Sequence, residues 1–78
     1  MNKQRRKDID RIIDNIEQVR EEIQTVLQEE QDYLDNIPEN LQSSERYETA
    51  QEAVNALEEA EGIIDDIIEY LMSARDGI

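Results

Sequence analysis

Apolar residues in the first half of this chain recur at alternating spacings of three and four, and this repeat constrains the fold more than any other feature. The stripe begins at Ile9 and reaches Ile37, with Glu30 as its one acidic member. The spacing is that of the a and d positions of a coiled coil, where one face of a helix packs along another helix. We therefore predict a long helix with a helical partner. The stripe consists of Ile9, Ile12, Ile16, Val19, Ile23, Val26, Glu30, Tyr33 and Ile37.

A second stripe with the same spacing follows the only proline, Pro38. A residue before proline is displaced from the helical region, so the first helix must end near Asn36. Asp8 is the expected cap of the first helix, and Ser43 or Ser44 that of the second. The second stripe reads Ala53, Leu57, Ala60, Ile64, Ile67, Leu71, Ala74 and Ile78. We predict one domain, residues 1–78, with a basic segment at 1–7, helices at about 8–36 and 44–76, and a turn at 37–43.

A turn this short predicts an antiparallel helical hairpin, in which residues equally distant from Asn40 face each other. Further apolar residues flank each stripe, and an exposed apolar strip predicts self-association. The expected fold class is all-α: a coiled-coil-like hairpin that dimerises into a four-helix bundle. A larger helical assembly or a hetero-oligomer is the alternative. The residues assigned to self-association are Ile13, Leu27, Leu34, Ile63, Ile67, Ile68 and Leu71.

The formal net charge of −13 is distributed unevenly along the chain. Residues 1–11 contain five basic and two acidic residues, a balance of +3, so residues 12–78 carry −16. Such a field repels nucleic acid and anionic membranes and attracts basic protein surfaces. Direct nucleic-acid binding is therefore not expected. The basic segment either contacts an anionic ligand or pairs with acids at the end of the second helix.

An outward face of the second helix gathers many of the acids. It is either a solvated face or a mimic of a phosphate backbone, because carboxylates at helical intervals on a rigid rod can occupy a groove built for nucleic acid. The predicted partner-binding face consists of Glu52, Glu58, Glu59, Asp65, Asp66, Glu69 and Asp76.

The chain contains no Cys and no His, which excludes disulfides, thiolate zinc sites and His-centred catalysis. Small all-α nucleotide pyrophosphohydrolases bind magnesium through Glu-x-x-Glu pairs on facing helices, and Glu58-x-x-Glu61 and Asp66-x-x-Glu69 have that local spacing. No matching pair lies on the first helix. We therefore expect no enzyme activity, no metal and no cofactor. With no apolar run of about 20 residues and no signal peptide, we expect no membrane contact and a cytoplasmic location.

The turn offers a resemblance. The segment DNIPENLQSSERYE, followed by the acidic helix AVNALEEAEGIIDDIIEYL, resembles small acidic helical proteins of bacteriophages and of prophages of Gram-positive bacteria. The resemblance covers roughly residues 29–73, and it implies a phage context without a defined activity. Some residues of the turn are not needed to end the first helix or to begin the second. Leu41 is expected to cap the end of the bundle. The turn residues singled out are Pro38, Glu39, Asn40, Leu41 and Gln42.

These features together predict a non-enzymatic interaction protein, phage-encoded, that binds and inhibits a host protein in the bacterial cytoplasm. Restriction, CRISPR and transcription proteins are the expected targets, because each has a surface that binds nucleic acid. The alternative is a structural or assembly protein whose helices form a homo-oligomeric bundle and whose acids serve solubility.

Overall fold

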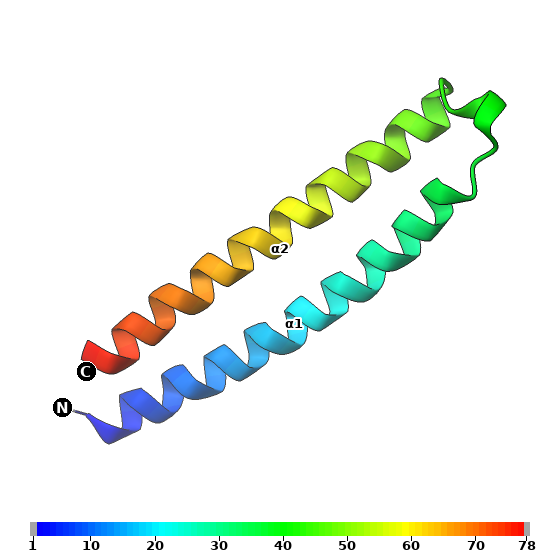
Figure 1. Ribbon diagram of the computed structural model, residues 1–78. Helices are drawn as coiled ribbons and strands as arrows, with labels where there is room; N and C mark the ends of the chain where they lie inside the picture. The colour runs from blue at the N-terminus through cyan, green and yellow to red at the C-terminus, as the bar shows by residue number, and fades with distance from the viewer. Residues whose placement is uncertain (1, 78) are drawn as a thin grey trace.

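The computed structural model describes residues 2–77, which form two antiparallel helices of equal length (Figure 1). Helix α1 spans Lys3–Asp35 and helix α2 spans Glu45–Gly77, with 33 residues in each. A short 3₁₀ helix, η1, spans Glu39–Leu41 in the connection between them. The start of α1 and the end of α2 lie together at the end opposite the turn. The prediction of an all-α helical hairpin is confirmed.

Helix α1 begins five residues earlier than the sequence indicated. Asn2, in an extended conformation, caps the helix, and its side chain accepts a hydrogen bond of 3.0 Å from the backbone N–H of Arg5. Asparagine is as good a cap as aspartate, since its short side chain places an oxygen near the free N–H groups of the first turn. Asp8 therefore lies inside the helix. Most of the basic segment forms the first two turns of α1 rather than a separate tail.

The connection closes as its residue types predict. Asn36 ends α1 by donating its side-chain amide to the carbonyl of Asp32 at 2.7 Å. Pro38 then starts η1, where the N–H of Leu41 donates to the Pro38 carbonyl at 2.8 Å. Ser44 caps α2, because its hydroxyl accepts a hydrogen bond from the N–H of Tyr47 at 3.3 Å. Of the two candidate serines, Ser44 is the cap.

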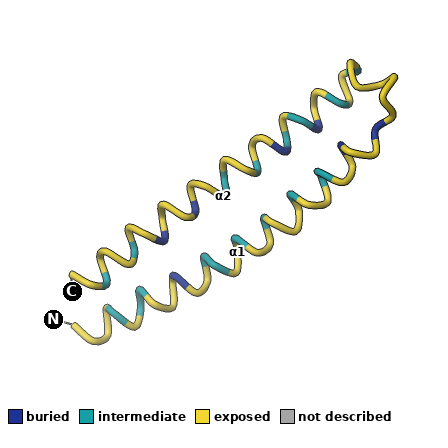
Figure 2. Tube along the Cα trace, in the orientation of Figure 1, coloured by how far each residue is buried: buried dark blue, intermediate teal, exposed yellow. Residues whose placement is uncertain are grey.

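The buried residues, dark blue in Figure 2, are contributed by both helices and lie where the two helices face each other. One cluster lies near the turn and a second lies toward the termini, and each combines residues from both helices. Leu27 and Tyr47 pack against the first cluster, and Ile9, Ile16, Ile23 and Leu71 against the second. We call this contact between α1 and α2 the seam. Its buried residues are Leu34, Ile37, Ala50 and Val54 near the turn, and Ile13, Ile64 and Ile68 toward the termini.

The hairpin is a rod rather than a compact body. Its radius of gyration is 17.7 Å, and its Cα atoms extend over 61 × 15 × 12 Å. A compact domain of this length would have a radius of gyration of about 11.5 Å. Two helices side by side bury one stripe each, so most of the surface of both helices stays accessible within a single chain.

Leucine truncation on and off the seam tests this packing. We expect Leu34→Ala to lower the free energy of unfolding by about 2–4 kcal/mol, because Leu34 is only 5% exposed and its loss leaves a cavity. The matched control is Leu41→Ala in η1, where the side chain is 39% exposed and the expected loss is below about 1 kcal/mol. Urea unfolding at one fixed protein concentration measures both. Equal losses would show that Leu41 caps the core, as the sequence suggested.

Candidate functional site

The seam uses a different set of α1 residues from the one the sequence favoured. Ile9, Ile16 and Ile23 contribute as expected, but the row that completes the seam contains Ile13 and Leu34, which are buried. The predicted row remains exposed on the flank: Ile12, Val19, Val26 and Tyr33. Arg20 explains the difference. It lies in the same row as Ile13 and Leu34, and a charged residue makes that row look solvent-exposed in the sequence.

Arg20 is tolerated on the seam because its long side chain reaches the margin. Its guanidinium forms an ion pair with Asp65 of α2, and its side chain is 30% exposed. The apolar stem of an arginine can cover neighbouring apolar surface while the charged end reaches water or a carboxylate. A charged residue inside the apolar repeat therefore does not exclude that row from the seam.

Most of the residues assigned to self-association lie on the seam instead. Ile13, Leu34 and Ile68 are buried by the other helix of the same chain, and Leu27 and Leu71 pack against the same clusters. Those five side chains therefore serve the hairpin itself. Ile63 and Ile67 are the two members of the set that remain exposed.

The two sides of the seam differ in chemistry. On one side, polar contacts join the helices: Gln24 donates to Glu61 at 2.7 Å, Arg75 donates to Asp10 at 3.0 Å, and Arg20 pairs with Asp65. We call this side the polar edge. Hydrogen bonds to Asp10 first, and then to Asp76, raise the pKa of the Arg75 guanidinium above its ordinary value. The polar edge is thus closed by contacts within one chain.

The other side of the seam is apolar. Residues three and four apart on a helix lie side by side, so Ile12 lies beside Ile9 and Ile16, on the flank away from Arg20. The exposed fraction is 50% for Val26, 52% for Ile63 and 78% for Tyr70. We call this side the apolar edge. It comprises Ile12, Val19, Val26 and Tyr33 of α1 and Ala53, Ala56, Ala60, Ile63, Ile67, Tyr70 and Ala74 of α2.

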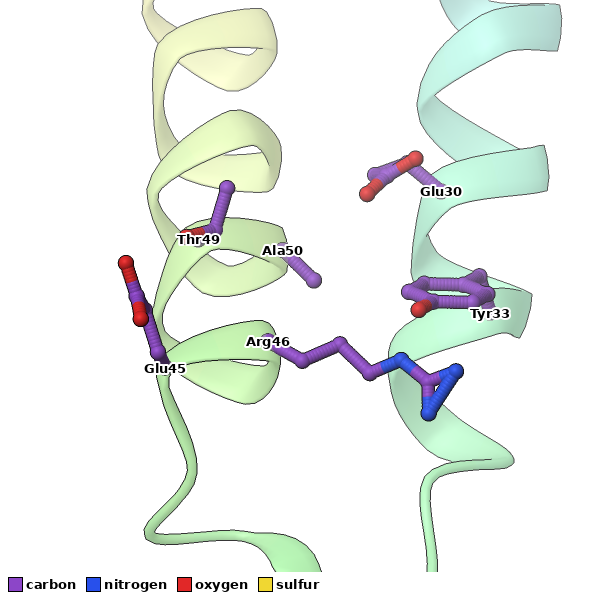
Figure 3. A pocket seen from close by; sticks show the side chains of 6 residues that line it. All are labelled: Glu30, Tyr33, Glu45, Arg46, Thr49 and Ala50. Atoms are coloured by element: carbon purple, nitrogen blue, oxygen red, sulfur yellow. The ribbon is translucent and has the colours of Figure 1, made fainter.

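A shallow depression near the turn shows that both helices contribute to this edge. Tyr33 of α1 and Arg46 of α2 line it together, and the Arg46 side chain extends across the gap toward Tyr33 (Figure 3). Arg46 precedes Ala53 by one heptad and Ala60 by two, so these alanines lie on the same side of α2. Within residues 2–77 Arg46 forms no ion pair, although Glu30 and Glu45 line the same depression.

All seven acids of the predicted binding face are exposed on α2. Asp65 pairs with Arg20, and Asp76 shares Arg75 with Asp10. The other five form no ion pair with any residue that the structure describes. Glu52, Glu59 and Asp66 are spaced by seven and therefore follow one line along the helix. The whole set spans about 36 Å at 1.5 Å per residue.

The basic segment remains largely uncompensated. Arg11 approaches Asp8 at 4.0 Å, whereas Lys3, Arg5, Arg6 and Lys7 form no ion pair among residues 2–77. Pairing of this segment with the acids of α2, one of its two possible roles, is not observed among residues 2–77. The ion pair at this end runs in the opposite direction, from Arg75 of α2 to Asp10 of α1.

Across residues 2–77 no group of three or more carboxylates is arranged to hold a metal ion. One oxygen of Glu61, a member of the Glu58-x-x-Glu61 pair, accepts the hydrogen bond from Gln24. In the same part of the chain neither helix is long and apolar enough to cross a membrane.

Comparisons with family models, with curated proteins and with solved structures find no match. The geometry therefore defines the class, an acidic helical hairpin with one polar and one apolar edge.

A double-mutant cycle on Arg20 and Asp65 tests the polar edge. We expect Arg20→Gln and Asp65→Asn to show a coupling energy of about 0.5–1 kcal/mol in dilute buffer, because the pair lies on the protein surface. The coupling should shrink in 1 M NaCl, where the Debye length is about 3 Å. Arg11 and Asp8, which are 4.0 Å apart and more exposed, are the control pair, with an expected coupling below about 0.3 kcal/mol. Similar couplings for both pairs would contradict a special role for Arg20.

Proposed function

We propose that this chain is a non-enzymatic interaction protein that works as a homodimeric four-helix bundle. The apolar edge is the observation that carries the proposal. Val19 and Val26 of α1 and Ile63 and Ile67 of α2 all expose apolar surface on it. An exposed apolar patch bordered by charged surface is typical of a protein contact site. A second copy of the chain offers the same surface, so the two edges can cover each other.

The broad side of the hairpin is large enough for a stable contact. It measures 61 × 15 Å between Cα atoms, a projected area of about 900 Å². A standard protein interface buries roughly 800 Å² on each partner. The polar edge already has its carboxylates and guanidinium groups paired within one chain, so it competes poorly for the same role. Dimerisation through the apolar edge also supplies the burial that a short chain lacks by itself.

We assign the binding of another protein to the predicted partner-binding face of α2, which we call the acidic face. Of its five unpaired acids, Glu58 and Glu69 lie on the side of α2 opposite Ala60, whereas Glu59 and Asp66 lie beside Ile63 at the rim of the apolar edge. Charged residues at the rim of an interface stay accessible to solvent. A rigid line of carboxylates attracts a basic protein surface at long range and can compete with nucleic acid for a basic groove. The resemblance to acidic helical proteins of phages suggests a host protein as the target, with inhibition as the result. Proteins of restriction, CRISPR and transcription systems have suitable grooves.

A structural role is the second candidate. The apolar edge by itself supports an assembly protein that forms a bundle with its own copies, with the acids serving solubility. Gene neighbourhood separates the two proposals, because early anti-host genes and late morphogenesis genes cluster apart in phage genomes.

Neutralising the acidic face tests the first proposal. The variant changes the five unpaired acids to amides: Glu52→Gln, Glu58→Gln, Glu59→Gln, Asp66→Asn and Glu69→Gln. We expect at least a tenfold loss in the retention of a basic, nucleic-acid-binding protein from bacterial lysate, because the steering charge and the carboxylate contacts disappear together. Quantitative pull-down at low and moderate salt measures retention.

The matched control removes five acids from α1 and gives the same net charge: Asp14→Asn, Glu21→Gln, Glu22→Gln, Asp32→Asn and Asp35→Asn. We expect this control to retain the partner within about threefold of the original chain. An equal loss in both variants would show that only total charge matters. A chain that retains no protein at either salt concentration would remove the binding proposal and leave the assembly role.

A further inference from the structure

We infer that the second copy docks head to tail, so that the turn of each hairpin lies against the termini of the other. This inference rests on the self-association proposed above and specifies its geometry. In this arrangement α1 packs along α1 of the second copy, α2 packs along α2, and the two-fold axis crosses the rod near its middle. The alternative places both turns at the same end and packs α1 over α2 of the second copy.

Charge complementarity favours the head-to-tail arrangement. The start of α1, residues 1–11, carries +3, and Lys3, Arg5, Arg6 and Lys7 have no ion-pair partner among residues 2–77. Residues 29–41, at the other end of α1, contain five acids and no base, a charge of −5. In the α1 register given below, where facing residue numbers sum to 45, residues 1–11 (+3) lie over residues 34–44 (−2), and the −5 segment lies over residues 4–16 (+1), at both ends of the dimer. Opposite charges in register stabilise a contact and like charges destabilise it.

The alternative arrangement, with both turns at the same end, is less favourable when the charges of facing segments are compared. It places the −5 segment of α1 over residues 45–52 of the second copy, which contain three acids and Arg46, a charge of −2. It also places the basic start of α1 over residues 69–78, whose charge is only −1. Each turn end would then repel the other.

Side-chain size supports the same register on α2. If two copies of α2 pack antiparallel about Ala60, Ile67 of one copy faces Ala53 of the other. In the neighbouring row of α2, which is offset from this register by one residue, Ile63 lies nearest Ala56 and Tyr70 lies nearest Thr49. Each large side chain meets a small one, which is how facing helices interdigitate. Ala60 meets its own copy at the axis, where two small residues allow the helices to approach closely.

Helix α1 gives an independent and consistent position for the axis. Pairing its exposed row with its own copy in antiparallel order sets Val19 against Val26 and Ile12 against Tyr33, which centres the contact between residues 22 and 23. Gln24 contacts Glu61 and Arg20 contacts Asp65 across the seam, so the point between residues 22 and 23 is level with residues 62 and 63 of α2, about 4 Å along the helix from Ala60. A single two-fold axis near the middle of the rod therefore passes close to the centre of both contacts.

Cysteine cross-linking tests the axis directly, because the natural chain has no cysteine. In Ala60→Cys the two introduced thiols meet across the axis, and a disulfide needs Cβ atoms about 3.8 Å apart. We expect nearly complete cross-linking of Ala60→Cys under mild oxidation. The control variants Ala53→Cys and Ala74→Cys lie in the same row but about 20 Å and 40 Å from their own copies, at 1.5 Å per residue. Each should remain uncross-linked alone, whereas a mixture of Ala53→Cys and Ile67→Cys should cross-link.

Light scattering of the reduced Ala60→Cys protein distinguishes a dimer with another arrangement from a chain that does not dimerise. A dimer that does not cross-link through Ala60→Cys would overturn the head-to-tail arrangement and leave self-association standing. Equal cross-linking of Ala60→Cys and Ala74→Cys would also overturn it, because the contact would then be parallel or non-specific. A mass of one chain, with helical circular dichroism retained, would remove both the dimer and this inference.

Discussion

The seam between α1 and α2 is narrow, and the rest of the structure follows from that limit. Two helices that meet side by side bury one stripe of each, here the clusters around Leu34 and Val54 and around Ile13 and Ile68. Between these clusters the seam carries Arg20, so its middle is polar at one margin. A polar residue within an apolar repeat fixes the register at a cost in stability. A chain of 78 residues with this seam alone has a small core.

The two edges of the seam differ in how well they can bind a second chain. On the polar edge, Arg20 and Arg75 each hold a carboxylate of the other helix, so its charges are satisfied within the chain. On the apolar edge, side chains such as Val26 and Ile63 remain half exposed. Burial of apolar surface is the main driving force of association. In the dimer that we propose, a second hairpin on that edge completes the core.

The hairpin could be predicted from the sequence because its signals are local. The repeat of three and four, Pro38 and a serine cap define two helices and a turn within a few residues of their observed ends. The α1 row that completes the seam could not be predicted in the same way. Both candidate rows are apolar, and the deciding contact joins Arg20 to Asp65, 45 positions away. The cap at Asn2 was a local signal and was missed because Asp8 offered an equally good one.

The mass of the protein in solution tests the central claim, that the apolar edge is covered by a second copy. Light scattering on the purified chain, at concentrations from about 1 to 100 μM, measures it beside circular dichroism as a control for folding. One chain has a mass of 9.2 kDa. Our account predicts about twice that mass, since interfaces of standard size commonly hold at micromolar concentration or below. A fully helical, stable protein with the mass of one chain across the whole range would contradict it.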